Sequence, residues 1–296
     1  MSMMVQSGRF GGGVADDPNL LNFAKGALPA GVTYSGGTNG TRVNAAGLVV
    51  LATGPRFDYS PTTLAALGIL CEPARTNLIT SSESIDLFNS VGSASVAANT
   101  SASPRNDNTA DTISLNSSFG HARKFEVPFP NSSVGAFSVY LKSPTAGAGV
   151  YLTTNNTADW NTGLSAKFAP TAVWGRGAIA GALGSGSGRI HTMIGNVKAD
   201  SSSDPTIPTE AIVAWGAQLE VMLAGQRQEA STYIPTDATA VTRSADQISF
   251  TIPAGIASLQ YTFDDGSTQT VAVSPGAYTV PTNLNRARIK TIGLLA

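Results

Sequence analysis

The scarcity of charged residues is the feature that most limits how this chain can fold. Lysine, arginine, aspartate and glutamate make up 12 % of its 296 residues, against roughly 25 % in ordinary globular domains. Long surface helices carry such residues on the face that they turn to water. Small polar and β-branched residues, which suit strands and tight turns, take their place here. We therefore predict an all-β protein, and the 42 % of hydrophobic residues is enough to fill its core.

The balance of charge excludes some partners. The formal net charge is −1 and the isoelectric point about 6.1, so no overall field attracts nucleic acid or an anionic membrane surface. No stretch approaches the ~18 to 20 apolar residues of a membrane span. Residues 1–10 lack the basic and apolar regions of a secretory signal. We expect a soluble protein that is made in the cytoplasm, with no nucleic-acid partner and no membrane insertion.

The middle of the chain, residues 61–246, has the pattern of a β-sandwich. Ala110–Leu115 and Gly135–Leu141 alternate polar and apolar residues, which is typical of half-buried strands. Phe137, Val139 and Leu141 fall on one face of the second segment. Such strands recur every 10 to 20 residues in the sequence, and none is followed by a segment of helical period. This order predicts an antiparallel jelly roll of about eight strands.

The two ends of the chain differ from this middle part. Residues 1–60 are punctuated by glycine and turn residues, such as Gly11-Gly12-Gly13 and Asn39-Gly40, and we interpret them as an extended arm that attaches the protein to a neighbour. Residues 247–296 hold short strands around the Asp265-Gly266 turn, a hairpin signal. They are expected to form a small β module.

The sequence offers little for catalysis. His121 and His191 lack metal-ligand spacing, and Cys71, which lies after Gly68-Ile69-Leu70, has the context of a buried apolar residue. The carboxylates that a glycosidase would need as a pair are isolated in the sequence: Glu126, Asp159 and Glu210. We do not expect an enzyme.

Two sets of residues are candidates for binding. The aromatic and amide groups of Tyr151, Asn155, Asn156 and Trp160 suit a glycan, because aromatic faces stack on sugar C–H surfaces and amides bind hydroxyls. The alternative is that they are ordinary residues at a sandwich edge.

Oxygen-bearing side chains form the second set. Asp107, Asn108 and Asp111 are candidate ligands of a calcium ion, the only cofactor that the sequence suggests. The alternative is a turn that precedes the strand Ala110–Leu115.

Ordered motifs give the chain a resemblance to a known family. They are PRFDYSP at 55–61, GILCEPARTNLITSSE at 68–83, WGAQLE at 215–220 and STYIPT at 231–236, followed by VTRSAD at 241–246. Together they resemble the pattern of phage and prophage virion proteins described as tail-fibre, head-fibre or head-spike components. The resemblance implies a carbohydrate-binding-module-like jelly roll and other virion proteins as partners.

The motifs also carry structural expectations of their own. Glu72 and Arg75 are among the few charged residues near an apolar strand. We interpret them as buried groups that pair with each other or form hydrogen bonds with backbone atoms. Trp215 is expected on the same face as Ala217 and Leu219, in the core, with an exposed platform for sugar as the alternative.

Three functions follow from these observations. The first is a non-enzymatic structural protein of a bacteriophage virion, exposed as a capsid decoration, head fibre or tail fibre, made in the bacterial host cytoplasm and trimeric by analogy with phage fibres. The alternative is an adhesin that recognises a host cell-surface glycan. A polysaccharide depolymerase is the third, although phage depolymerases of this kind are usually long repetitive β-helices and no repeat is present.

Overall fold

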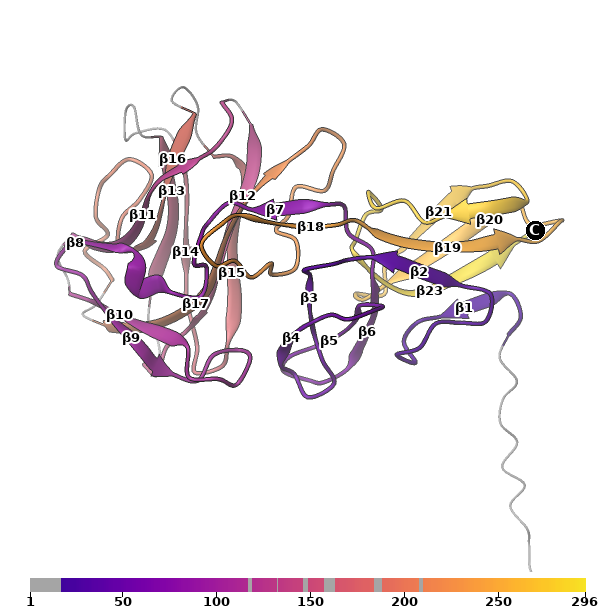
Figure 1. Cartoon of the computed structure of the whole chain (residues 1–296), viewed down its shortest axis with the longest axis horizontal. Helices are drawn as coiled ribbons and strands as arrows, with labels where there is room; N and C mark the ends of the chain where they lie inside the picture. The colour runs from indigo at the N-terminus through magenta and orange to yellow at the C-terminus, as the bar shows by residue number, and fades with distance from the viewer. Residues whose placement is uncertain are drawn as a thin grey trace, which may run out of the picture.

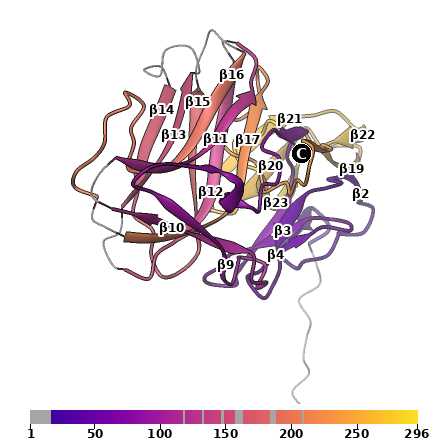
Figure 2. The same ribbon diagram turned by 60° about the vertical axis from the view of Figure 1, so that its left-hand side comes forward.

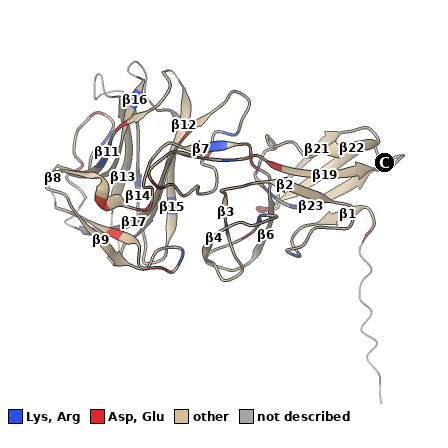
Figure 3. Cartoon of the chain, in the orientation of Figure 1, with Lys and Arg blue, Asp and Glu red and all other residues tan. Residues whose placement is uncertain are grey.

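The fold is described by a computed structural model over residues 17–116, 119–131, 133–145, 149–156, 163–183, 188–207 and 210–296. Within these ranges the chain is built from antiparallel strands and a single 3₁₀ turn, η1 (Ile85–Leu87), so the all-β prediction is confirmed. The strands form a larger and a smaller lobe (Figure 1). Charged residues are few along the whole ribbon (Figure 3). No helix in the described part is long and apolar enough to cross a bilayer.

The larger lobe is the predicted jelly-roll sandwich, made of two five-stranded sheets (Figures 1 and 2). The first sheet has the order β15 (Gly175–Ala182), β12 (Val134–Lys142), β17 (Glu210–Met222), β10 (Ala110–Leu115) and β9 (Ser95–Ser101). The second has the order β14 (Gly163–Phe168), β13 (Val150–Asn156), β16 (Arg189–Gly195), β11 (Gly120–Pro128) and β8 (Asn89–Gly92). Phe137, Val139 and Leu141 all lie in the core between the sheets, as their alternation predicts.

The smaller lobe joins a six-stranded sheet to a three-stranded one. The large sheet has the order β21 (Thr268–Ala272), β20 (Ser258–Phe263), β23 (Arg288–Leu295), β6 (Ala66–Leu70) and β5 (Phe57–Tyr59), with β1 (Leu20–Asn22) also on β23. The other has the order β2 (Thr33–Gly36), β19 (Asp246–Ile252) and β22 (Gly276–Thr279). A separate apolar core lies within this lobe, and Cys71 is buried there as expected.

The described part of the N-terminal segment differs from the extended arm that its glycines suggest. Leu20 pairs with Gly293 on β23, and Gly36 pairs with Asp246 on β19. Phe23 is fully buried in the core that the C-terminal strands also line. A module of about fifty residues buries too little apolar surface by itself, and this segment supplies the missing strands. The smaller lobe therefore contains both ends of the described chain, and the expected boundaries at 60 and 247 do not separate the lobes.

Four buried charged residues connect the lobes. Arg56 forms an ion pair with Asp246 and another with Glu72, whose Oε2 lies 2.7 Å from Nη2 of Arg56. The Nη2 atom of Arg243 lies 3.6 Å from Oε2 of Glu72, and its Nη1 atom lies 3.7 Å from Oδ2 of Asp246. All four side chains are at most 4 % exposed. The small two-stranded sheets β7 (Arg75–Asn77) with β18 (Val241–Arg243), and β3 (Thr41–Val43) with β4 (Val49–Leu51), lie at the same junction.

Glu72 and Arg75 are both buried, but they do not pair with each other. Glu72 faces Arg56 and Arg243, and it accepts hydrogen bonds from the backbone N–H and the hydroxyl of Thr232. The Nε atom of Arg75 lies 3.5 Å from Glu220 instead. Residues three apart in an extended segment point to opposite sides, which separates the two side chains.

A bulge in β17 changes which face Trp215 occupies. The pairing with β12 shifts between Ser138 and Tyr140, and Gly216 has a φ of +66°, which favours glycine. Trp215 is fully buried, as expected, but it packs in a small aromatic cluster outside the sandwich. Ala217 and Leu219 lie in the sandwich core. The expectation that the three share one face is therefore wrong.

Candidate functional site

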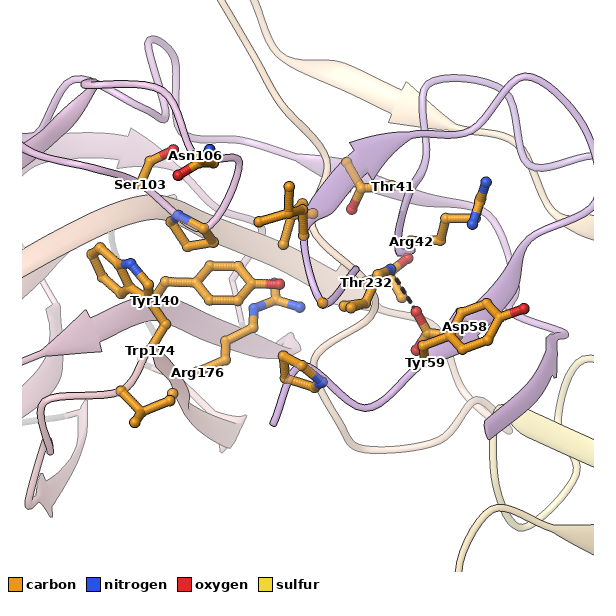
Figure 4. A pocket seen from close by; sticks show the side chains of 18 of the residues that line it. Thr41, Arg42, Asp58, Tyr59, Ser103, Asn106, Tyr140, Trp174, Arg176 and Thr232 are labelled. Atoms are coloured by element: carbon orange, nitrogen blue, oxygen red, sulfur yellow. Dashed lines mark hydrogen bonds between the residues drawn. The ribbon is translucent and has the colours of Figure 1, made fainter. Parts of the chain in front are cut away.

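A cavity of about 440 Å³ lies between the two lobes (Figure 4). The jelly-roll side is lined by β12, by the start of β15 and by the loop that follows β9. Strands β3, β4 and β5 line the other side, together with the start of β23. The volume is within the ~300 to 1,000 Å³ range of small-molecule sites, and such sites often form between lobes or domains.

Two aromatic side chains form one wall of this cavity. Because Val139 and Leu141 point into the sandwich core, Tyr140 points out of the sandwich, towards the smaller lobe. Trp174 lies beside Tyr140, whereas Tyr59 lies on the opposite side of the cavity, and its hydroxyl points away from these two rings (Figure 4). The indole N–H of Trp174 donates to the carbonyl of Ala102 at 3.2 Å, which fixes the ring.

Two buried aromatic rings support Tyr140 from behind. Its ring centroid lies 5.7 Å from that of Trp215 and 6.2 Å from that of Tyr233. Trp215 and Tyr233 themselves are 4.8 Å apart, and the indole N–H of Trp215 donates to Thr109 at 3.0 Å. Tilted and edge-on contacts of this kind stabilise aromatic clusters. The aromatic wall of the cavity is thus held in place before any ligand arrives.

Four cationic side chains line the same cavity. The ammonium of Lys142 lies 4.7 Å from the ring centroid of Trp174, and the guanidinium of Arg176 lies 5.3 Å from that of Tyr140. Burial lowers the pKa of Lys142. Arg42 donates to the carbonyl of Phe57 at 3.3 Å.

The fourth cation, Arg288, is neutralised by a carboxylate. Its Nε atom lies 2.6 Å from Asp58, which also accepts a hydrogen bond from the backbone N–H of Val43 at 2.6 Å. Burial opposes the charge on Arg288, but the nearby Asp58 outweighs burial and raises the pKa of Arg288. Asp58 is itself buried, and its two oxygens each accept one of these hydrogen bonds.

The residues that the sequence suggests for glycan binding do not form an open patch. Asn155 and Asn156 are buried on β13, and the hydroxyl of half-buried Tyr151 donates to Asp204 at 3.2 Å. The segment 196–207 contacts this strand, since Thr153 donates to Val197 at 2.6 Å. Trp160 lies outside the described residues. The three described residues therefore contribute to packing and hydrogen bonding within the lobe.

The residues that the sequence suggests for calcium make turn hydrogen bonds. Asp107 accepts from the hydroxyls of Ser103 and Thr109, and Asn108 donates to the carbonyl of Asn99. Asp111 accepts backbone N–H groups of Asp86 and Asn99. Within the described ranges, no group of three or more histidine, cysteine or acidic residues is arranged to hold a metal. The alternative interpretation as a turn fits this geometry.

The histidines and the cysteine lie in different lobes. Burial, followed by the charge of nearby Arg123, lowers the pKa of both His121 and His191 to about 4. Cys71 lies in the core of the smaller lobe, where burial raises the pKa of its thiol to about 12. Because the thiol lies in the other lobe from the two imidazoles, these three residues cannot form one metal site.

The isolated carboxylates of the sequence are not brought together as a pair. Glu126 lies on the surface, where its carboxylate is 3.4 Å from Arg189. Asp159 and the side chain of Glu210 lie outside the description.

The structure resembles solved carbohydrate-binding modules. A family 61 module in complex with β-1,4-galactotriose is 17 % identical, with a TM-score of 0.35, and the match covers 48 % of this chain and 97 % of that one. A family 22 xylan-binding domain from Paenibacillus barcinonensis is 13 % identical, with a TM-score of 0.36, covering 51 % and 94 %. Tailspike protein 4 of bacteriophage CBA120 is 12 % identical, with a TM-score of 0.33, covering 49 % and 21 %. The likeness concerns the jelly-roll fold alone. No family model and no curated protein sequence matches this chain.

Sequence reasoning missed the residues that line the cavity. Tyr140 and Lys142 are the outward-facing residues of β12, whose inward-facing residues Val139 and Leu141 the alternation predicts. That alternation shows which side chains leave the core, but it contains no information on what they face. Tyr59, Trp174 and Arg288 come together only because the two lobes pack against each other.

Proposed function

We propose that this protein binds a saccharide in the cavity between its lobes. The observation that carries the proposal is the aromatic wall of Tyr140 and Trp174, which is surrounded by hydrogen-bonding groups. Sugars present C–H faces that pack on aromatic rings and hydroxyls that bind polar groups. A mostly apolar pocket with a few fixed polar groups is the usual form of a site for a small ligand.

The fixed geometry of the wall favours binding. Tyr140 is held by Trp215 and Tyr233, and Trp174 by its hydrogen bond to Ala102. Binding costs less free energy when the side chains that contact the ligand are already ordered. Thr232 supplies a polar group between the lobes, where its hydroxyl is hydrogen-bonded to Glu72.

Substitution of Trp174 tests this proposal. Trp174→Ala is expected to weaken binding to glycans on a printed array by tenfold or more, because the indole is one of the two rings that form the aromatic wall of the cavity. Phe125→Ala is the matched control, since Phe125 is an exposed aromatic residue on β11 that does not line the cavity. Unchanged binding by Trp174→Ala, or an equal loss in Phe125→Ala, would contradict the proposal.

We further propose that the protein is exposed on a phage particle, without catalytic activity. Four of the five motif segments that resemble virion proteins meet at one place, the lobe junction: 55–61 supplies Arg56, 68–83 supplies Glu72, 231–236 supplies Thr232, and 241–246 supplies Arg243 and Asp246. This convergence supports the view that the segments form one structural unit. Gold-labelled antibodies against the chain are expected to decorate particles in electron micrographs, and purified particles that carry no label would contradict the assignment.

A further inference from the structure

We infer that the saccharide bound between the lobes is anionic, a sugar that carries a carboxylate or a sulfate group. This inference rests on the proposed saccharide site and specifies its ligand. The cavity is lined by Arg42, Lys142, Arg176 and Arg288, against one carboxylate, Asp58. The whole chain, by contrast, has a net charge of −1. The cavity therefore concentrates positive charge that the rest of the molecule does not have.

Three of these cations have no carboxylate partner among the described residues. Lys142 donates to the carbonyl of Ala102, and Arg42 donates to that of Phe57. Arg176 donates to the carbonyl of Ser231 at 2.5 Å and to the hydroxyl of Ser138 at 2.8 Å. Arg288 alone is paired, with Asp58.

The adjacent lobe junction shows, for comparison, how buried structural cations are paired in this chain. There Arg56 and Arg243 are matched by two carboxylates, Glu72 and Asp246, and all four are buried together. Cations that are removed from water without such partners lower the stability of the chain. Arg42, Lys142 and Arg176 are instead only half-buried, so they remain accessible from the cavity and can pair with a bound anion.

Arg176 is in the best position to receive that anion. Its two hydrogen bonds and its position against Tyr140 fix the guanidinium at the cavity wall. These bonds use two of its five N–H groups. A planar guanidinium binds a carboxylate or sulfate through paired hydrogen bonds, while the neighbouring rings contact the sugar.

An array that displays acidic and neutral glycans side by side tests the inference with the full chain. Its acidic members carry uronic acid, sialic acid or sulfate groups, so that carboxylate and sulfate ligands are distinguished. We expect the strongest signals from acidic glycans, at least tenfold above their neutral counterparts at low salt. The difference should shrink at 0.5 M sodium chloride, because salt screens the attraction.

Substitutions of cavity residues test whether the preference for acidic glycans arises in the cavity. Arg176→Gln and Arg42→Gln are each expected to reduce the preference for acidic over neutral glycans by about tenfold. Arg189→Gln, which removes a surface charge on β16 outside the cavity, should leave it unchanged. Thermal melting confirms that each variant is folded, and Arg42→Gln keeps the test valid if loss of Arg176 disturbs the fold.

The possible outcomes separate this inference from the proposed function. Equal or stronger binding of neutral glycans, still lost in Trp174→Ala, would overturn the anionic ligand and leave the saccharide site intact. An acidic preference that survives in both Arg176→Gln and Arg42→Gln would also overturn it. The absence of any glycan signal would overturn the saccharide site itself.

Discussion

Replacing Asp246 with alanine is expected to lower the free energy of unfolding by about 3–5 kcal/mol, because it leaves buried cations without a partner. Asp246 accepts hydrogen bonds from Nε of Arg56 at 2.9 Å and from the backbone N–H of Glu72 at 2.8 Å. Without Asp246, Glu72 would be the one carboxylate of this cluster left to pair with both Arg56 and Arg243. Urea unfolding followed by far-UV circular dichroism measures the loss.

Arg189→Ala is the matched control for this experiment. It removes an ion pair whose two side chains are 54 % and 48 % exposed, and exposed pairs contribute less than about 1 kcal/mol. Similar losses in the two variants would mean that the buried charges do not hold the lobes together.

Lowering the pH should weaken the interactions among the same four buried residues, Arg56, Glu72, Arg243 and Asp246. Burial alone would raise the pKa of Glu72, but Arg243 and Arg56 outweigh burial and hold it well below its usual range. The folded protein therefore keeps Glu72 ionised where the unfolded chain is already protonated. This contribution to stability is complete above pH 4.5 and is lost as the pH falls below that value.

Gly68→Ala is expected to destabilise the smaller lobe by about 3 kcal/mol or more. Gly68 has a φ of +100°, and a Cβ atom there would lie 2.0 Å from the carbonyl oxygen of Ile289 on β23. The added methyl group strains the backbone and pushes β6 away from β23, where the two strands pair.

Gly255→Ala separates these two effects. Gly255 has a similar φ of +88°, but a Cβ atom there meets nothing within 4 Å. Gly255→Ala should therefore lower the free energy of unfolding by only ~1–2 kcal/mol, the cost of an unfavourable backbone conformation. If urea unfolding gives equal losses for the two variants, the close approach of β6 and β23 is not what requires glycine at position 68.

Some of the fold could be predicted because its signals are local. Composition gave the β class, and a period of two placed Phe137, Val139 and Leu141 in the sandwich core. The pairing of Leu20 with Gly293 could not be predicted in this way. Strands of three residues, such as β1, are too short to show a period, and nothing local in the sequence states which distant strand completes a sheet.

The candidate site depended still more on contacts between distant residues. The aromatic and amide residues of β13 have the chemistry of a glycan site, but the segment 196–207 packs against them. One glycine, Gly216, was enough to turn Trp215 from the expected face. The residue types were reasonable guides to ligand chemistry, but the packing of the lobes decided which of them surround a cavity.

The return of the chain to its starting point has a mechanical consequence. Residues near 20 and near 293 are neighbours in one sheet, and the jelly roll is a long excursion between them. A tensile force applied through both termini would peel β1 from β23 while the sandwich carried no load. The first contact to break under such a force would therefore be the pairing of β1 with β23, which extends over three residues.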